Sequence, residues 1–319
     1  GFELLSFDCK NWEDIRVPAH IQMEGYDRPH YANVAYPWDG RQELKSGQSP
    51  MDFNPVASYV KYFTLPESFT GKNIVLRMEG VESAAAVWLN GHYIGYCEDS
   101  FTPSEFDLSK YIAAGENKLA IQVAKWCSGS WLEDQDFFRF SGIFRDICLY
   151  AKPKCHLEDI GINQIFDNKD LNKVKLDISL RLSQNAKVKL KLYDALDMTL
   201  KSNEFKCFFD ETLVTELDKN LVSGDNNVLF EINEPKLWSA EIPNLYTLYI
   251  EIYDGDNLLE VSSVKSGIRY FEKNSKNVMT VNGKRIVFAG VNRHDFSSKS
   301  GRAISYAEVK KDIVTIKEN

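Results

Sequence analysis

The chain has 319 residues, of which 44% are apolar and 26% are charged, and its formal net charge is −8 at pH 7. This is the composition of a folded globular protein, and the length predicts two or three domains. The acidic balance argues against nucleic acid as a partner, because phosphate binding needs a basic face. No apolar run approaches the ~18 residues that cross a bilayer, so no membrane partner is expected.

The cysteines and histidines follow no recognisable site spacing. The six cysteines contain no C-x-x-C pair, and they are Cys9, Cys97, Cys127, Cys148, Cys155 and Cys207. Irregular spacing in a long chain favours reduced thiols, and the sequence opens without a basic and then apolar leader, so the expected compartment is the cytoplasm. The five histidines lack the spacing of a zinc site.

Residues 1–152 are expected to form the first domain, built from short antiparallel strands. The segments NIVLRMEGV, AAVWLNGHYIGYC and NKLAIQVAKW are rich in β-branched and aromatic residues. Asn90-Gly91 lies between two such runs and predicts a hairpin, since both turn positions need positive φ. DSFTPSEFDLSKYIAAGEN is expected to be a connection with at most a short helical turn. Many short strands and no long helix predict a jelly-roll β-sandwich.

Residues 153–272 are expected to form a second β-domain. KVKLDISLRL, AKVKLKLYDA, NVLFEI and NLYTLYIEIYDG read as strands separated by DNKDLN, SGDNN and DGDN. The alternation from Val188 to Leu192 places one face in a core and the other in water. A run of about this length predicts an immunoglobulin-like β-sandwich, although it lacks the Cys–Trp–Cys pattern of antibody domains.

Residues 273–319 change in character. Asn282-Gly283 predicts a hairpin, and the wholly apolar run 286–289 predicts a strand buried on both faces, as in a parallel sheet. Ser305 and Glu308 form a capping box ahead of a helix whose apolar face holds Val309, Ile313 and Ile316. Strand, loop and helix make one β/α unit, whereas a (β/α)8 barrel needs eight. The fold prediction is therefore mainly β, ending in the first β/α unit of a truncated barrel.

Several long motifs, in this order, resemble glycoside hydrolase family 2, and most closely the large bacterial β-galactosidases. They are NVAYPWD (33–39), NGHYIGYCEDSFTPSEFDLSKYIAAGENKLAIQV (90–123), WLEDQDFFRFSGIFRD (131–146), EPKLWSAEIPNLY (234–246) and VNGKRIVFAGVNRHD (281–295). The resemblance implies a jelly-roll sugar-binding domain, an immunoglobulin-like sandwich and a catalytic (β/α)8 barrel. It also implies hydrolysis of terminal β-D-galactosides such as lactose with retention, which uses a pair of carboxylates about 5 Å apart. In the family both are glutamates on later barrel strands, so neither is expected before Asn319, and the chain alone is predicted to be inactive.

Three residues match positions that contact the sugar in the family. Asp136 corresponds to an aspartate that reaches the barrel mouth, binds the galactosyl hydroxymethyl group and helps to hold sodium, for which a carboxylate is a suitable hard ligand. The structural alternative is that Asp136 is a solvated loop acid or forms an ion pair with Arg139 or Arg145. Asn54, in MDFNPVASY, matches a sugar-contacting asparagine, and its alternative is a simple Asn-Pro turn. His294, in GVNRHD, matches a histidine that bonds galactosyl hydroxyls, and its alternative is a hydrogen-bonded structural role.

Other residues are given structural readings. Glu133 and Asp134 are expected to be solvated loop acids or to form local ion pairs. Asn292 and Arg293 are expected to brace the loop of His294. The tryptophans in or beside strands are expected to pack in cores: these are Trp88, Trp126, Trp131 and Trp238. Trp38, in the polar loop YPWDG, is the aromatic residue most expected to be exposed.

The resemblance leaves other functions open. A β-glucuronidase or β-mannosidase shares the same architecture, and a stand-alone carbohydrate-binding module would need no barrel. Magnesium is expected in the full-length enzyme, with ligands beyond this chain, and sodium at a partial site on Asp136. The full-length enzyme is also expected to be a homo-oligomer. The segment 203–227, where relatives lend a loop to a partner, departs in sequence, which weakens an assembly role for it.

Overall fold

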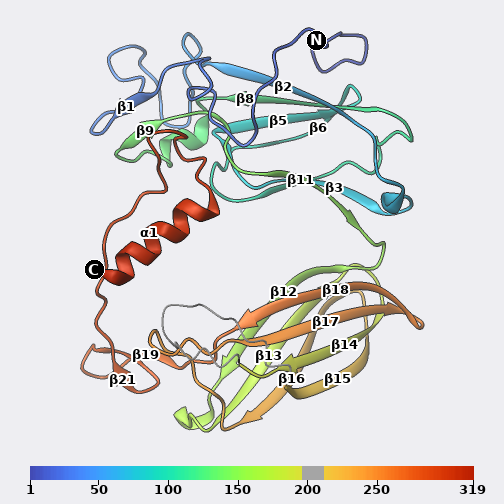
Figure 1. Cartoon of the computed structure of the whole chain (residues 1–319), viewed down its shortest axis with the longest axis vertical. Helices are drawn as coiled ribbons and strands as arrows, with labels where there is room; N and C mark the ends of the chain where they lie inside the picture. Colours follow the sequence, from blue (N-terminus) through green and yellow to red (C-terminus); the bar gives the residue numbers. More distant parts are fainter. Residues whose placement is uncertain (196–211) are drawn as a thin grey trace. The chain divides into compact units, whose positions relative to one another are not determined.

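The computed structural model describes residues 1–195 and 212–319, which fall into two compact units. Unit 1 contains residues 1–152 together with 292–319, and unit 2 contains residues 153–291 (Figure 1). The segment 273–319, expected to begin a third domain, is thus divided between the two units. Cys207 and the first part of the segment 203–227 lie outside the described residues.

Unit 1 is built on a β-sandwich with two main antiparallel sheets. The first sheet has the order β2 (Val56–Phe63), β8 (Asn117–Ala124), β5 (Ala84–Leu89) and β6 (His92–Cys97). The second has the order β11 (Ile147–Lys152), β3 (Asn73–Met78) and β7 (Ser104–Asp107). Two short ribbons join β1 (His30–Ala32) to β9 (Phe137–Arg139) and β4 (Val81–Glu82) to β10 (Gly142–Ile143).

One apolar core lies between the two main sheets of unit 1. Alternate residues of β3, β5 and β8 point into it, among them Leu76, Val87 and Ile121. The predicted hairpin is confirmed: β5 pairs with β6 through Leu89 and His92, and Asn90 and Gly91 have φ of 52° and 83°. A jelly roll of this kind carries its binding residues on the loops and ribbons at its rim.

Two expectations for unit 1 are wrong. The connection 99–117 contains a strand, β7, which pairs with β3 because Phe106 completes the second sheet over the core. Trp38 is only 1% exposed instead of projecting into solvent. It stacks on Tyr36 and packs edge-on against Trp126, so an aromatic cluster covers a loop whose local sequence is polar.

Unit 2 is an immunoglobulin-like sandwich of two antiparallel sheets. One has the order β12 (Leu157–Ile165), β13 (Lys173–Leu182) and β16 (Gly224–Asn233). The other has the order β15 (Leu213–Leu221), β14 (Ala186–Tyr193), β17 (Tyr246–Asp254) and β18 (Asn257–Ser266). The predicted alternation is confirmed, since Val188, Leu190 and Leu192 are buried in the core between these sheets.

The end of unit 2 contains a confirmed hairpin and a failed strand prediction. β19 (Phe271–Lys273) pairs with β20 (Met279–Val281), which pairs with β21 (Lys284–Arg285) across Asn282-Gly283. The predicted buried strand at 286–289 does not form, and Val287 and Phe288 are 75% and 72% exposed. A parallel strand needs neighbours for its backbone groups, and no strand among the described residues pairs with this run.

The only α-helix among the described residues is α1 (Tyr306–Glu318), which belongs to unit 1. Its capping box is confirmed, because the Ser305 hydroxyl accepts from the Glu308 amide and the Glu308 carboxylate accepts from the Ser305 amide. Three short 3-10 turns complete the structure at Glu67–Phe69, Ser128–Trp131 and Asp167–Lys169. Within the described ranges, no helix has both the length and the apolar character needed to cross a membrane.

Candidate functional site

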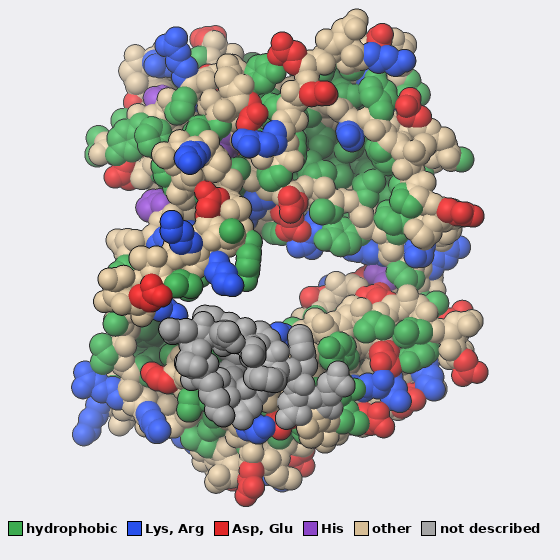
Figure 2. Space-filling view, in the orientation of Figure 1, with side chains coloured by type: hydrophobic (Ala, Val, Ile, Leu, Met, Phe, Trp, Pro, Cys, Tyr) green, Lys and Arg blue, Asp and Glu red, His purple; other side chains and the backbone are tan. Residues whose placement is uncertain are grey.

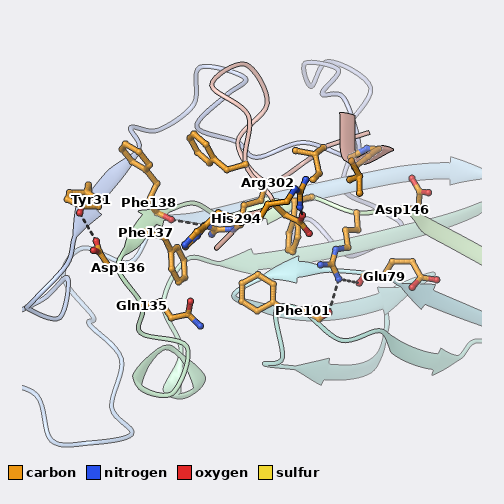
Figure 3. Close-up of a pocket in the computed structure, with 18 residues that line it drawn as sticks. Tyr31, Glu79, Phe101, Gln135, Asp136, Phe137, Phe138, Asp146, His294 and Arg302 are labelled. Atoms are coloured by element: carbon orange, nitrogen blue, oxygen red, sulfur yellow. Dashed lines mark hydrogen bonds and ion pairs between the residues drawn. The ribbon is translucent and has the colours of Figure 1, made fainter. Parts of the chain in front are cut away.

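A cavity of about 960 Å³ lies in unit 1, between the rim of the β-sandwich and the segment that leads into α1 (Figure 3). Its walls combine aromatic rings with cationic and anionic side chains. The lining residues are Pro18, Tyr31, Glu79, Phe101, Gln135, Asp136, Phe137, Phe138, Phe144, Arg145, Asp146, Arg293, His294, Asp295, Phe296, Arg302, Ile304 and Val309. Aromatic faces beside polar groups suit a ligand that has both C–H and hydroxyl surfaces.

Asp136 reaches the cavity from the residue just before β9. Its Oδ1 accepts a hydrogen bond of 2.5 Å from the Tyr31 hydroxyl, and this bond raises the pKa of Tyr31. Neither arginine proposed as its structural partner pairs with it: Arg139 binds Asp134, and Arg145 donates to the backbone carbonyl of Phe101 at 2.7 Å. The exposed carboxylate of Asp136 therefore keeps an oxygen that can accept from a ligand.

The neighbouring acids of Asp136 have structural roles: Asp134 forms an ion pair, as the sequence allowed, whereas Glu133 binds Ser100 instead of a cation. Glu133 accepts from the amide and hydroxyl of Ser100 at 2.9 and 2.6 Å, and Asp134 forms an ion pair with the buried Arg139. These bonds fix both ends of the 133–139 segment. The position of Asp136 is thus fixed by bonds of its neighbours, and the Asp136 carboxylate itself is not needed to hold the segment in place.

His294 also lines the cavity, from the loop that precedes α1 and lies far from Asp136 in the sequence. Arg293 forms ion pairs with Asp295 and with Asp312 of α1, which confirms that Arg293 braces the loop. Phe296 stacks on Phe138 with ring centroids 5.7 Å apart and an interplanar angle of 10°. The imidazole of His294 is exposed on this braced loop, so both ring nitrogens are available for hydrogen bonding.

Below this wall lies a buried polar group formed by Glu82, His20 and Arg302. Glu82 forms an ion pair with Arg302, and its other carboxylate oxygen comes 3.9 Å from His20 Nδ1. Burial raises the pKa of Glu82 to about 7, against the opposing effect of Arg302. Burial, with the added charge of Arg302, lowers the pKa of His20 to about 3. His20 is therefore neutral at pH 7, and its approach to Glu82 is not an ion pair.

Asn54 is not part of this cavity. Its side-chain amide donates to the Trp126 carbonyl at 2.8 Å and its carbonyl accepts from the Trp126 amide at 2.9 Å. This pair of bonds ties the start of β2 to the end of β8 and uses both polar ends of the amide. The structure thus brings Asp136 and His294 to one cavity and leaves Asn54 apart from it.

Sequence reasoning missed several residues of the site. Tyr31, Phe296 and Glu82 carried no local signal of function, since each stands in an ordinary loop or strand sequence. A weak signal existed for Arg302, which is an arginine directly after a glycine in a loop that the family resemblance places at the barrel mouth. Tyr31 could be recognised only from the β1–β9 register, which sets Tyr31 against Phe138.

The described residues offer little for a metal. No group of three or more His, Cys, Asp or Glu side chains in residues 1–195 and 212–319 is arranged to hold one. The second carboxylate oxygen of Asp136 is a hard donor of the kind that sodium prefers, but it fits as one ligand of several.

Sequence comparison matches three domain models along the chain. They are described as the glycosyl hydrolases family 2 sugar binding domain (residues 4–153), glycosyl hydrolases family 2 (155–269) and the glycosyl hydrolases family 2 TIM barrel domain (273–319). A β-galactosidase of Halalkalibacterium halodurans is 44% identical over 100% of this chain and 30% of its own length. One from Clostridium acetobutylicum is 43% identical over 98% of this chain and 33% of its own. A β-galactosidase large subunit of Latilactobacillus sakei is 39% identical over 100% of this chain and 51% of its own.

Among solved structures, a β-glucuronidase of Bacteroides uniformis superposes with a TM-score of 0.76 at 22% identity. The superposition covers 99% of this chain and 36% of that one. A β-glycosidase of Bacteroides vulgatus gives the same TM-score and identity, over 99% of this chain and 37% of its own. At this identity the likeness concerns the fold. The chain spans about a third of the length of most of the relatives named above.

Proposed function

The chain belongs to glycosyl hydrolase family 2, and from that membership we propose that it forms part of a β-galactosidase that hydrolyses terminal β-D-galactosides with retention. The observation that carries the proposal is the 44% identity, along the whole chain, to a relative named β-galactosidase. The β-glucuronidase of Bacteroides uniformis shares the fold at only 22% identity, so it supports the fold and not the specificity.

In this proposal, Asp136 and His294 bind the galactosyl unit. The free oxygen of Asp136 accepts from a sugar hydroxyl, and His294 can donate or accept from the other side of the same cavity. Phe137 and Phe138 flank them and offer aromatic faces to the apolar side of the ring. The catalytic glutamates are expected outside this chain, so these residues hold and orient the substrate and carry out no bond cleavage.

The same proposal extends to metals, assembly and compartment. The second oxygen of Asp136 would supply one ligand of a sodium ion, which would add a positive charge near the sugar hydroxyls; magnesium would be held by residues outside the chain. A homo-oligomer is expected for the complete enzyme. The cytoplasm is supported by the five cysteines that the structure describes, each of which has a free thiol.

The test is turnover of nitrophenyl glycosides. The isolated 319-residue chain should release no nitrophenol from the β-galactoside. The same chain continued into its remaining barrel should prefer the β-galactoside to the β-glucuronide and the β-mannoside. A preference for the glucuronide or the mannoside would overturn the proposed galactoside specificity and leave the family assignment unchanged.

Variants of the continued polypeptide test the site. Asp136→Asn and His294→Ala should each lower kcat/KM by roughly 10²-fold or more, because each removes hydrogen bonds to the substrate in the transition state. The matched control is Asp256→Asn, an exposed carboxylate in the turn between β17 and β18, which should leave kcat/KM unchanged. Equal effects of Asp136→Asn and Asp256→Asn would contradict the assigned role.

A carbohydrate-binding module is the second candidate, favoured by the match to a sugar binding domain. The module predicts that the isolated chain binds sugar, whereas the β-galactosidase proposal predicts that it does not. Calorimetric titration with galactose and lactose separates them: we expect no measurable heat for the isolated chain, since it supplies only part of a pocket. A dissociation constant of millimolar or tighter would support the module.

A further inference from the structure

The loop that carries His294 packs directly on the β-sandwich of unit 1. Gly301 lies so close to the ring of His20 that a Cβ at position 301 would be 2.7 Å from His20 Cδ2. Ser297 and Gly301 exchange backbone hydrogen bonds of 2.8 and 2.9 Å, which close the loop on itself. The loop is therefore positioned by two contacts: Phe296 stacks on Phe138, and Gly301 covers the ring of His20.

Arg302 connects this loop to the strand that follows Asp136. Its Nη1 donates to the Phe138 carbonyl at 2.8 Å, and its Nη2 donates to Glu82 Oε1. The guanidinium also lies over the Phe137 and Phe140 rings, at 4.5 and 5.2 Å from their centroids. One planar cation thus contacts β9, which directly follows Asp136 (Figure 3), and β4, which contains Glu82, while its backbone belongs to the loop of His294.

Glu82 has no other strong partner. It is 5% exposed, and its Oε2 has no hydrogen-bond partner among the described residues. Arg139 and Glu133 also act on Glu82 through space, but neither forms an ion pair with it. A buried carboxylate with one cationic partner depends on that partner, because removal leaves an uncompensated charge.

We propose that Glu82 and Arg302 are a positioning pair, which holds the His294 loop against β9 so that His294 and Asp136 face one cavity. A purely stabilising ion pair could lie anywhere in the sandwich. This one joins the loop that carries His294 to β4, and the same guanidinium donates to Phe138 on β9, the strand that directly follows Asp136. The identity of the bound sugar rests on the proposed function, but the positioning itself does not.

The pair requires arginine in particular. A guanidinium can donate to Phe138 and Glu82 at once through its planar fork, whereas an ammonium group on a flexible stem is a point charge. Arg302→Lys should therefore keep the positive charge but hold the loop less firmly against β9. Arg302→Met should release the loop. Glu82→Gln keeps an acceptor for the guanidinium but removes the counter-charge.

Amide hydrogen exchange of the 319-residue chain measures the loop directly. In Arg302→Met we expect exchange at Ser297 and Gly301 to accelerate at least about tenfold, a loss of about 1.4 kcal/mol in local opening free energy. Arg302→Lys should fall between Arg302→Met and the wild type. Amides in the centres of β3, β5 and β8 should keep their wild-type rates, which separates release of the loop from loss of the fold.

Reaction of His20 with diethylpyrocarbonate gives a second readout. His20 is fully buried under Gly301, so it should resist modification in the wild type and react in Arg302→Met and Glu82→Gln. The matched control is Lys299→Met, which removes an exposed cation from the same loop without touching Glu82. It should behave as the wild type in both measurements.

The pH profile distinguishes a paired carboxylate from a passive one. Burial raises the pKa of Glu82 to about 7, and opening of the loop would expose this carboxylate to water and lower its pKa. The closed loop therefore binds the extra proton, and loop opening in the wild type should decrease as the pH falls through 7, after correction for intrinsic exchange. Glu82→Gln should remove that dependence. Arg302, Arg139, Glu133 and His20 also face Glu82, but they are common to both proteins.

Three results would overturn the proposal: unchanged exchange in Arg302→Met, equal acceleration throughout the sandwich, or full protection with lysine at position 302. None of these measurements uses sugar or turnover. Failure of the positioning pair and failure of the proposed β-galactosidase function are therefore seen separately.

Discussion

The two units of this chain place their charges in opposite ways. Among the described residues of unit 2, the core cluster is apolar apart from the hydroxyl of Tyr246. Charged residues alternate with this core on the outside, where they form cross-strand pairs such as Lys187–Asp218 and Arg181–Asp225. Figure 2 shows cationic and anionic side chains interspersed over the visible face of unit 2. In unit 1, charged groups lie within the packed structure: Glu82, Lys118, Lys125 and Arg139 are all 5% exposed or less.

This difference separates a scaffold from a unit that holds loops in place. The buried cations of unit 1 tie segments distant in sequence: Lys118 Nζ donates to the carbonyls of Leu4 and Phe7, and Lys125 pairs with Asp27 at 2.7 Å. Regular sheets satisfy their own backbone, but irregular segments need side chains to fix them. Buried charge in unit 1 therefore marks irregular segments that side chains hold against the sheets.

The largest effect should come from removing a large side chain from the apolar core of unit 2. Leu190→Ala, in the middle of β14, removes a side chain that is 1% exposed and should lower the unfolding free energy of unit 2 by about 2–5 kcal/mol. Urea unfolding followed at Trp238, which is the tryptophan of unit 2, measures it. Leu229→Ala, exposed on β16, is the control, and a similar loss there would show that the core assignment is mistaken.

Removal of a buried cation should be the next largest effect. Arg139→Met leaves Asp134 without its ion-pair partner and removes the donor to the Gln135 carbonyl at 2.8 Å. We expect a loss of about 3 kcal/mol, because breaking a buried pair strands one charge. The tryptophans of unit 1 report the transition by fluorescence, and an unfolding midpoint equal to that of the wild type would refute the structural role of the buried charge.

The pH dependence of stability should contain two opposing contributions in unit 1. The raised pKa of Glu82, about 7 against 4.5, means that the folded state binds an extra proton between about pH 4.5 and 7, so stability falls as the pH rises. The lowered pKa of His20, about 3 against 6.5, means that the unfolded chain binds the extra proton between about pH 3 and 6.5, so stability rises with pH. Between pH 4.5 and 6.5 the two slopes cancel in part.

Single variants should expose each slope. Glu82→Gln should leave a stability that rises with pH by up to about 1.4 kcal/mol per pH unit below 6.5, and His20→Gln should leave the opposite slope. Thermal unfolding between pH 4.5 and 7 measures both, relative to the wild type. Parallel profiles for the two variants would show that the groups do not titrate as their burial requires.

The smallest effect should come from the same kind of substitution, arginine to methionine, at an exposed position on unit 2. Arg181→Met removes the exposed pair with Asp225, in which the nitrogen and oxygen are 2.7 Å apart. Solvent screens such a pair, so the unfolding midpoint should stay within the scatter of replicate measurements. A loss as large as that of Arg139→Met would remove the distinction between the two units.

Most of the fold could be predicted from the sequence where the pattern is local. The alternation of β14, the two Asn-Gly hairpins and the capping box of α1 each depend on neighbours within a few residues. The predictions failed where distant residues decide. The run 286–289 has the composition of a buried strand but pairs with no strand in the part of the chain that the structure describes. Trp38 is covered by residues of other segments.

The residues that line the cavity were predicted in part. Asp136 and His294 were identified through the family resemblance and line one cavity, whereas Asn54 is bound to the backbone of Trp126. Tyr31, Arg302 and Glu82 could not be found from the sequence, because their importance depends on contacts across more than a hundred residues.

The sequence by itself determined the strands, the turns and the family, since periodicity, turn chemistry and long motifs are properties of the chain as written. Only the tertiary structure decided which charges are buried and which of the matched residues meet. A carboxylate such as Glu82 is identical in sequence to an exposed one, and its burial and its pairing with Arg302 exist only once residues 82 and 302 are packed together.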